Sequence, residues 1–234
     1  MKRAESQVVV AVLMPHAPVL VPGVGGDRAR AVARTIGALT TAAGRIVETR
    51  PDAVVVVSPH ASRRGDRVPV YLGERVRGSL EDFGAPERSV DLPVAGRLVT
   101  ELERDSRFRG SLAPLRDTRL DHGALVPLWH VQEAGWDGPV LVLGPNAEDA
   151  APLEALGRAL AAAASRASMS IALVASGDLS HRLRPGAPSG YDPRAGEFDR
   201  ALMDCIREGA FGRVRDLDPE LRELAAEDAV EPLI

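Results

Sequence analysis

Four stretches of the chain are almost continuously apolar and rich in β-branched residues: Gln7–Met14, Asp52–Ser58, Val140–Leu143 and Ser170–Ala175. A strand with one face in water alternates apolar and polar residues, whereas a strand covered on both faces is apolar throughout. The pattern therefore predicts four buried strands in a mostly parallel sheet. A further short strand is expected at Val68–Leu72, inside a polar stretch (residues 62–89) that we expect to pass over the functional edge of the sheet.

Segments with apolar residues at helical spacing lie between and after these strands: Asp27–Arg50, Pro93–Asp105, Glu148–Arg166 and Arg194–Arg207. Alternation of strands and helices indicates an α/β fold with right-handed crossovers. We expect a mostly parallel or mixed central sheet with helices on both faces. The sequence shows no repeat, low-complexity linker or break in composition, so residues 1–234 are predicted to form a single domain.

Composition excludes several classes of function. The net charge is -4, and basic residues are scattered among acids, so no basic face for nucleic acid is expected. No apolar run approaches the ~20 residues of a membrane span. The apolar run near the N-terminus is broken at Pro15 and reads as a first strand rather than a signal peptide. A single cysteine, Cys205, permits no intramolecular disulfide, which suits the cytoplasm.

Three of the five histidines directly follow apolar runs. His16 ends the run in ‘VAVLMPHAP’, His60 ends the run in ‘AVVVVSPHA’, and His181 follows ‘IALVASGDLS’. In a parallel sheet, the loops at the carboxyl ends of the strands form the ligand crevice. We therefore expect the rings of His16 and His60 to approach each other. Pro15 and Pro59 precede them and fix the direction in which the chain leaves the sheet.

Two neutral imidazoles on rigid strand ends suit a divalent transition metal. A third ligand, preferably a carboxylate, would complete a facial triad and leave coordination positions open. His122, in ‘RLDHGALVPLWH’, stands at the expected start of a helix, after Asp121. His130 ends the same segment, where a packing role is expected, and we place it outside the site.

The motifs ‘MPHAP’, ‘VVVSPH’, ‘LDHGALVPL’ and ‘SGDLSHRL’ occur in this order along the chain. Together they resemble the class III extradiol ring-cleaving dioxygenases, of the type of the catalytic subunit of protocatechuate 4,5-dioxygenase. Memo-like proteins share this fold. The resemblance extends from His16 to about Pro232, which is nearly the whole chain.

The resemblance implies the α/β fold of the catalytic chain of these class III extradiol dioxygenases and an Fe(II) ion held by two histidines and a C-terminal glutamate. By motif, His16 and His60 are the metal histidines, His181 the acid–base residue and His122 a second pocket histidine. The segment ‘AAEDAVEPLI’ supplies Glu227 as the glutamate, with Asp228 and Glu231 as competitors. Memo-like proteins carry cysteine in place of the carboxylate, and the Asp at position 228 favours the dioxygenase-type ligand set.

The function implied is cleavage of a catechol-type ring with O2 in the catabolism of aromatic compounds. The partners expected are a small aromatic diol and O2, with a homo-oligomer or a small capping subunit left open. Zn or Mn in place of Fe(II) also stays open. Trp129, Tyr191 and Phe198 are candidates to line the pocket. Two alternatives remain: a Memo-like metal-binding protein without ring cleavage, and a zinc-dependent hydrolase that activates water.

Overall fold

The computed structural model describes residues 7–116, 119–145 and 150–234. Its strands are β1 (Val8–Met14), β2 (Ala53–Val57), β3 (Val68–Leu72), β4 (Arg75–Leu80), β5 (Ala85–Pro93), β6 (Leu112–Arg116), β7 (Val140–Leu143) and β8 (Ile171–Ser176). Its α-helices are α1 (Ala33–Glu48), α2 (Gly96–Glu103), α3 (His122–Glu133), α4 (Ala150–Ala167), α5 (Ala195–Arg207), α6 (Pro219–Ala225) and α7 (Val230–Leu233). The described residues also form the 3-10 turns η1 (Pro18–Leu20), η2 (Gly26–Val32), η3 (Glu81–Phe83) and η4 (Phe211–Asp216).

Six strands form the central sheet in the order β1-β8-β2-β7-β3-β6. The first four strands in this order are parallel to one another, whereas β3 is antiparallel to β7 and parallel to β6. The predicted α/β class with a mostly parallel sheet is therefore confirmed. Met14 pairs with Ser176 and Val57 with Ala175, so β1, β8 and β2 end level with one another. Loops that follow these three strands leave the sheet from one edge.

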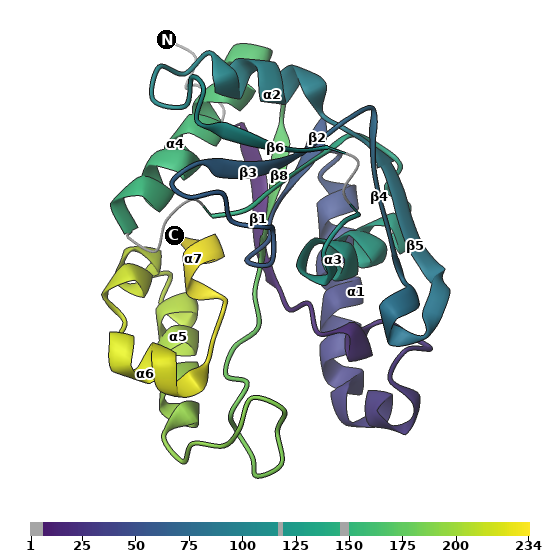
Figure 1. Cartoon of the computed structure of the whole chain (residues 1–234), viewed down its shortest axis with the longest axis vertical. Helices are drawn as coiled ribbons and strands as arrows, with labels where there is room; N and C mark the ends of the chain where they lie inside the picture. Colours follow the sequence, from purple (N-terminus) through teal and green to yellow (C-terminus); the bar gives the residue numbers. More distant parts are fainter. Residues whose placement is uncertain (1–6, 117–118, 146–149) are drawn as a thin grey trace.

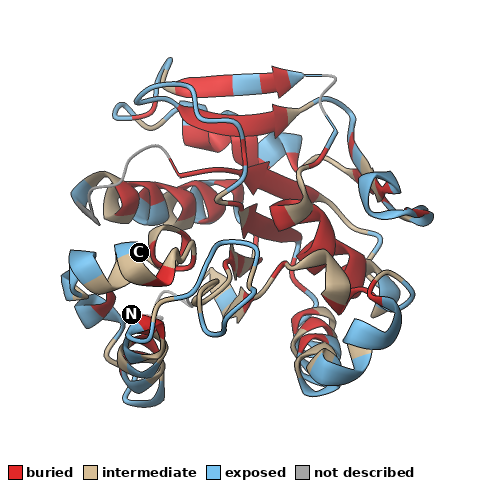
Figure 2. Cartoon of the chain, turned by 60° about the horizontal axis from the view of Figure 1, so that its bottom comes forward, coloured by how far each residue is buried: buried red, intermediate tan, exposed pale blue. Residues whose placement is uncertain are grey.

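Helices cover both faces of the sheet. The strand β2 is apolar throughout because its side chains pack against helices on both faces. Val54 and Val56 pack into one hydrophobic cluster with side chains of α1 and α3, whereas Ala53 and Val55 pack into another with α2 and α4. All four residues are fully buried. Figure 2 shows the same arrangement, with buried strands at the centre and helices exposed on their outer sides.

A third hydrophobic cluster joins α5, α6 and α7 beyond the carboxyl edge of the sheet (Figure 1). Its buried members include Phe198 and Cys205, and the cysteine serves as a small apolar side chain. This C-terminal cluster meets the end of β8 closely at Gly177. A Cβ atom at that glycine would lie 2.4 Å from the Cα of Ala229, so only glycine allows the contact.

Several boundaries differ from the prediction. The hairpin of β4 and β5, which packs on α3, was not predicted, because its strands carry charged residues on an exposed face. The strand β6 was also missed. The expected helix from Asp27 begins with the 3-10 turn η2, and the one from Pro93 begins at Gly96, after β5. The expected helix start at Glu148 lies outside the described residues. Among the residues that the structure describes, no helix is long and apolar enough to cross a membrane.

Candidate metal centre

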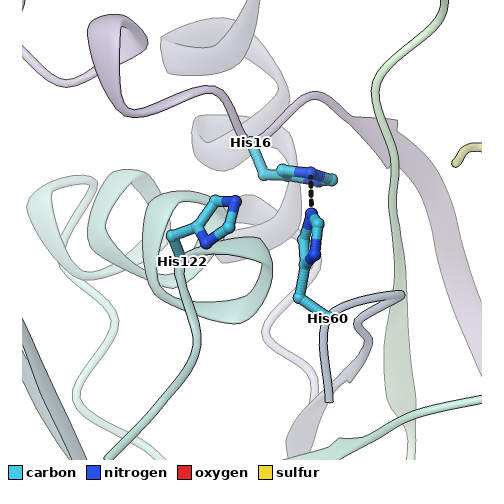
Figure 3. A group of neighbouring side chains, drawn as sticks. All are labelled: His16, His60 and His122. Carbon is cyan, nitrogen blue, oxygen red and sulfur yellow. Dashed lines mark hydrogen bonds between the residues drawn. The ribbon is translucent and has the colours of Figure 1, made fainter. Parts of the chain in front are cut away.

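Three histidine side chains meet at the carboxyl edge of the sheet (Figure 3). His16 follows β1, His60 follows β2, and His122 is the first residue of α3. One ring nitrogen from each lies within 4.8 Å of the other two. The Nε2 atoms of His16 and His60 are 3.0 Å apart, and the His122 ring lies beside His60 with 4.2 Å between the ring centroids. The parallel pairing of both strands with β8 brings the first two rings together.

The carboxylate of Asp228 completes a small triangle with two of these nitrogens. Its Oδ2 atom lies 3.3 Å from Nε2 of His16 and 3.4 Å from Nε2 of His60. The sides of this triangle, 3.0, 3.3 and 3.4 Å, are short enough for one cation to contact all three atoms at ~2.1 Å. Two imidazole nitrogens and a carboxylate oxygen fit a divalent transition metal.

Hydrogen bonds determine which ring nitrogen of His16 carries the proton and which one is free to bind a metal. Ser176, the last residue of β8, donates its only hydroxyl proton to the carbonyl oxygen of Gly123 at 2.5 Å. The same hydroxyl oxygen lies 2.9 Å from Nδ1 of His16 and must therefore accept a proton from that nitrogen. Neutral His16 consequently carries its lone pair on Nε2, which is the tautomer that binds a metal at that atom.

The first turn of α3 fixes the loop that carries His60. Asp121 is the N-cap of this helix, and its Oδ1 atom accepts hydrogen bonds from the backbone N–H of Ala124 at 3.0 Å and from the hydroxyl of Ser58 at 2.6 Å. The oxygen of Ser58 accepts in turn from the backbone N–H of His60 at 3.3 Å. Space here is tight, because a Cβ atom on Gly123 would lie 2.4 Å from Oγ of Ser58.

Asp178 connects the triangle to His181. Its Oδ1 accepts from the backbone N–H of His16 at 2.9 Å, and its own N–H donates to Oδ1 of Asp228 at 2.6 Å. The other oxygen, Oδ2, lies 3.9 Å from Nε2 of His16 and 3.7 Å from Nε2 of His181, a distance typical of an ion pair rather than a hydrogen bond. Nδ1 of His181 donates to the carbonyl oxygen of Ala226 at 2.5 Å.

The charges in the centre shift the pKa values of its groups in opposite directions. Asp178 raises the pKa of His181 to about 9, although partial burial opposes this. A hydrogen bond with Asp228 raises the pKa of His60, again against burial. Burial, followed by the charges of His60 and His16, lowers the pKa of His122.

The carboxylates of Asp228 and Asp178 remain ionised in spite of their burial. Burial alone would raise the pKa of Asp228, but the neighbouring imidazoles of His16 and His60 outweigh this and hold the pKa well below the usual range. The pKa of Asp178 is lowered in the same way, by His181 and His16 against burial. The centre therefore offers two negative charges to a cation, beside imidazole nitrogens.

A family model described as the catalytic LigB subunit of aromatic ring-opening dioxygenase matches residues 10–232. The chain belongs to this family. The matched range includes the three clustered histidines and Asp228, so the candidate metal centre lies within the LigB domain.

Two similar proteins extend the comparison. Protein CA_C1420 of Clostridium acetobutylicum is 28% identical over 218 residues, which cover 89% of this chain and 47% of that protein. The chain therefore spans about half the length of this curated relative. The crystal structure of uncharacterized protein JW3007 from Escherichia coli K12 has a TM-score of 0.53 and 25% identity, covering 83% of this chain and 78% of that one. Neither name states an activity.

The acidic residue expected as a LigB-type third ligand, Glu227, is engaged elsewhere. Its carboxylate pairs with Arg222 at 2.6 Å and accepts from the backbone N–H groups of Ala229 at 2.7 Å and Val230 at 2.9 Å, at the start of α7. Ala226 explains the difference, because its left-handed backbone (φ 51°) ends α6 and turns the following chain. After this turn, the Glu227 carboxylate caps the start of α7, whereas the Asp228 carboxylate faces His16 and His60.

The remaining competitor, Glu231, pairs with Arg63 at 2.6 Å. Of the three acidic side chains weighed for the third ligand, only that of Asp228 is in contact with the clustered histidines in the structure. The structure therefore does not bring the Glu227 carboxylate to the histidines, and the identity of the third ligand stays a prediction. Glu227 and Asp228 are adjacent acidic residues, and the sequence alone does not indicate which of them faces the histidines.

Other residues considered in the sequence analysis lie outside the candidate metal centre. Nε2 of His130 lies 3.1 Å from the carbonyl oxygen of Leu20, in keeping with a packing role outside the site. Trp129 and Phe198 are buried in hydrophobic clusters, and Tyr191 is exposed on the loop after His181.

Among the described residues, the phenylalanine ring that lies beside the centre is that of Phe83, at the tip of the β4–β5 hairpin. It stands edge-on to His122 at 5.8 Å between centroids and is 45% exposed. Sequence reasoning missed Phe83 because the hairpin itself was not predicted. Ser58 and Ser176 were missed as well, although each ends or follows an apolar strand, as the histidines do.

Proposed function

We propose that this LigB-family protein is a non-haem Fe(II)-dependent extradiol dioxygenase that opens a catechol-type ring with O2 in the cytoplasm. The observation that carries the proposal is the triangle formed by Nε2 of His16, Nε2 of His60 and Oδ2 of Asp228. Two histidines and one carboxylate are the facial ligand set of non-haem Fe(II) oxygenases. The proposal assigns the third-ligand role to Asp228 in place of Glu227.

When bound there, Fe(II) would supply Lewis-acid and oxygen chemistry toward the substrate hydroxyls. The chain's own residues would supply the proton transfers. His181 is the proposed acid–base residue because it lies across Asp178 from the histidine pair. A divalent charge nearby would lower its pKa from about 9, toward the range where imidazole both accepts and returns a proton.

Two further side chains are proposed to orient the substrate. His122 has a lowered pKa, so it is neutral at pH 7 and can hydrogen-bond a substrate oxygen without repelling the metal. Phe83 stands edge-on to His122 and offers an apolar ring contact from the hairpin. Offset and edge-on contacts between aromatic rings are favourable at centroid distances of about 4.5–7 Å. Both side chains are partly accessible from solvent, as a substrate site requires.

A zinc-dependent hydrolase remains the second candidate, because of one specific observation. Ligand nitrogens of His16, His60 and His122 all lie within 4.8 Å of one another, and three histidines with an open fourth position form a common catalytic zinc site. In that case the ion would activate a water molecule for attack on an ester or amide.

Metal content and oxygen uptake distinguish the candidates. The protein is purified without oxygen, its metal is quantified, and Fe(II)- and Zn(II)-loaded samples are tested against a panel of catechols and against ester and amide substrates. Iron retention with one O2 consumed per ring opened supports the dioxygenase. Tight zinc with ester or amide turnover supports the hydrolase, and metal without either activity supports a Memo-like role.

Two histidine variants serve as a matched pair. His60→Gln removes a proposed ligand and should abolish both iron retention and oxygen uptake. His130→Gln should preserve both, because glutamine can still donate to the carbonyl oxygen of Leu20. Equal loss in both variants would indicate a general defect in folding, and unchanged iron binding in His60→Gln would exclude this metal centre.

A further inference from the structure

A buried tyrosine lies behind the histidines. Tyr71 is on β3, and its side chain is 3% exposed. Its hydroxyl donates to Oδ2 of Asp121 at 2.8 Å, and the hydroxyl oxygen accepts from the backbone N–H of the same residue at 3.3 Å. Burial, followed by the charge of Asp121, raises the pKa of the phenol, so Tyr71 remains a neutral hydrogen-bond donor. Tyr71 therefore holds both the side chain and the backbone of Asp121.

The donor and the acceptor of each hydrogen bond in this network can be assigned. Ionised Asp121 can only accept, so the hydroxyls of Tyr71 and Ser58 both donate to it. Since the proton of Ser58 is used in this way, its oxygen is free to accept from the backbone N–H of His60. A continuous chain of hydrogen bonds thus runs from Tyr71 through Asp121 and Ser58 to His60.

Asp121 also precedes His122 directly and caps the helix that this histidine begins. One carboxylate thereby fixes two of the three clustered histidines, His60 through Ser58 and His122 through the backbone. We propose that Tyr71 is a positioning residue for the metal centre: its hydroxyl locks the rotamer of Asp121 and so sets where the rings of His60 and His122 lie. This inference rests on the proposed metal-binding function.

Close packing makes the centre sensitive to a small rotation of Asp121. A Cβ atom placed on Gly123 would lie 2.9 Å from Oδ1 of Asp121 and 3.0 Å from Cδ2 of His60, so no side chain fits between the Gly123 backbone, the carboxylate and the imidazole. Without the phenol, Oδ2 and the N–H of Asp121 lose the partner that they share. The carboxylate is then free to turn about its side-chain bonds, and Ser58 follows it.

The test compares Tyr71→Phe with Tyr191→Phe. These are the two tyrosines of the chain, and Tyr191 is half exposed on the loop after His181. Affinity for Co(II) is measured by competition with a chelator, together with the absorption spectrum of the Co(II)-saturated protein. Removal of a group that orients a metal ligand typically weakens binding ~10–100-fold. We expect that loss and an altered spectrum for Tyr71→Phe, and neither change for Tyr191→Phe.

A double-mutant cycle separates positioning from general destabilisation. If Tyr71 acts through Asp121 and Ser58, the losses of affinity in Tyr71→Phe and Ser58→Ala will not add in the double variant. Ser58→Ala also tests the same path if Tyr71→Phe does not fold. Wild-type affinity and spectrum in folded Tyr71→Phe, or fully additive losses, would overturn the proposal.

Metal-free protein provides a readout independent of the proposed function. The imidazole resonances of His60 and His122 should shift in Tyr71→Phe, and those of His130 should not. If the wild-type protein binds no metal, the proposed function fails, yet these resonances still decide whether Tyr71 positions the two rings. Unchanged resonances for both histidines would exclude that role.

Discussion

The Oδ2 atom of Asp228 lies 3.3 Å from Nε2 of His16, which joins a residue just before the last helix to one just after the first strand. The contact depends on both backbones. His16 donates its N–H to Asp178, and Asp178 donates its own N–H to Asp228, so one aspartate aligns the other two residues. The proposed ligand set is therefore held through main-chain hydrogen bonds as well as through its side chains.

Replacement of Asp228 should remove the metal, whereas replacement of Glu231 should not. Asp228→Ala deletes the only one of the two carboxylates that contacts the histidines, and we expect at least a tenfold loss of Fe(II) or Co(II) affinity. Glu231→Ala removes an ion pair with the half-exposed Arg63 and should bind metal like the wild type. Titration of both variants under anaerobic conditions checks this, and equal affinities would exclude Asp228 as a ligand.

Glu227→Gln should destabilise the fold. The Glu227 side chain is 2% exposed, pairs with Arg222 and accepts two backbone N–H groups at the start of α7. Loss of its charge weakens these bonds, and we expect the free energy of unfolding to fall by about 1–3 kcal/mol. Denaturant titration of metal-free protein measures the change. A variant as stable as the wild type but deficient in metal binding would instead restore Glu227 as a ligand.

Gly123→Ala should disturb the histidines sterically. The added methyl group would lie 2.4 Å from Oγ of Ser58 and 3.0 Å from Cδ2 of His60, closer than non-bonded atoms approach. Overpacking of this kind typically lowers stability by about 1–3 kcal/mol. Ser58→Ala removes the nearest atom, so the double variant should regain part of the stability. Thermal unfolding of the three variants tests the contact, and no loss in Gly123→Ala would contradict it.

The ion pair between His181 and Asp178 makes stability depend on pH. In the metal-free protein the pKa of His181 is raised to about 9, above the ~6.5 of an unfolded chain. Protonated His181 therefore stabilises the fold fully below about pH 6.5, and this contribution is lost as the pH rises through about 9. We expect the stability difference between wild type and His181→Gln to shrink over this range. Asp178→Asn should lower the pKa of His181, as measured by NMR, and an unchanged value would exclude the pair.

Phe83 should affect substrate binding without affecting the metal. Phe83→Ala removes the ring that lies edge-on to His122, and we expect KM for catechols to rise several-fold while kcat and iron affinity change little. Phe211→Ala is the matched control, because it deletes another exposed phenylalanine on η4. The same rise in KM for both variants would show that the effect is not specific to the site.

Much of this architecture could be predicted from the sequence, because burial on both faces forces a strand to be apolar throughout. The runs ending at Met14 and Val57 marked parallel strands, and the structure brings the histidines that follow them together. The hairpin that carries Phe83 escaped prediction, since its exposed strand faces are charged. The choice between Glu227 and Asp228 depends on the left-handed backbone of Ala226, which an alanine does not signal.

After β8 and the loop of residues 177–194, the chain enters the C-terminal cluster of α5, α6 and α7, and the cluster returns Asp228 to the histidines. If that cluster opened locally, Asp228 would leave His16 and His60, so opening and a complete ligand set exclude each other. A ligand that binds only the closed form lowers the population of the open form in proportion to its concentration over Kd. Availability of the metal would thus set how long the C-terminal cluster survives a protease, and the proteolytic lifetime would report on occupancy of the centre without any substrate.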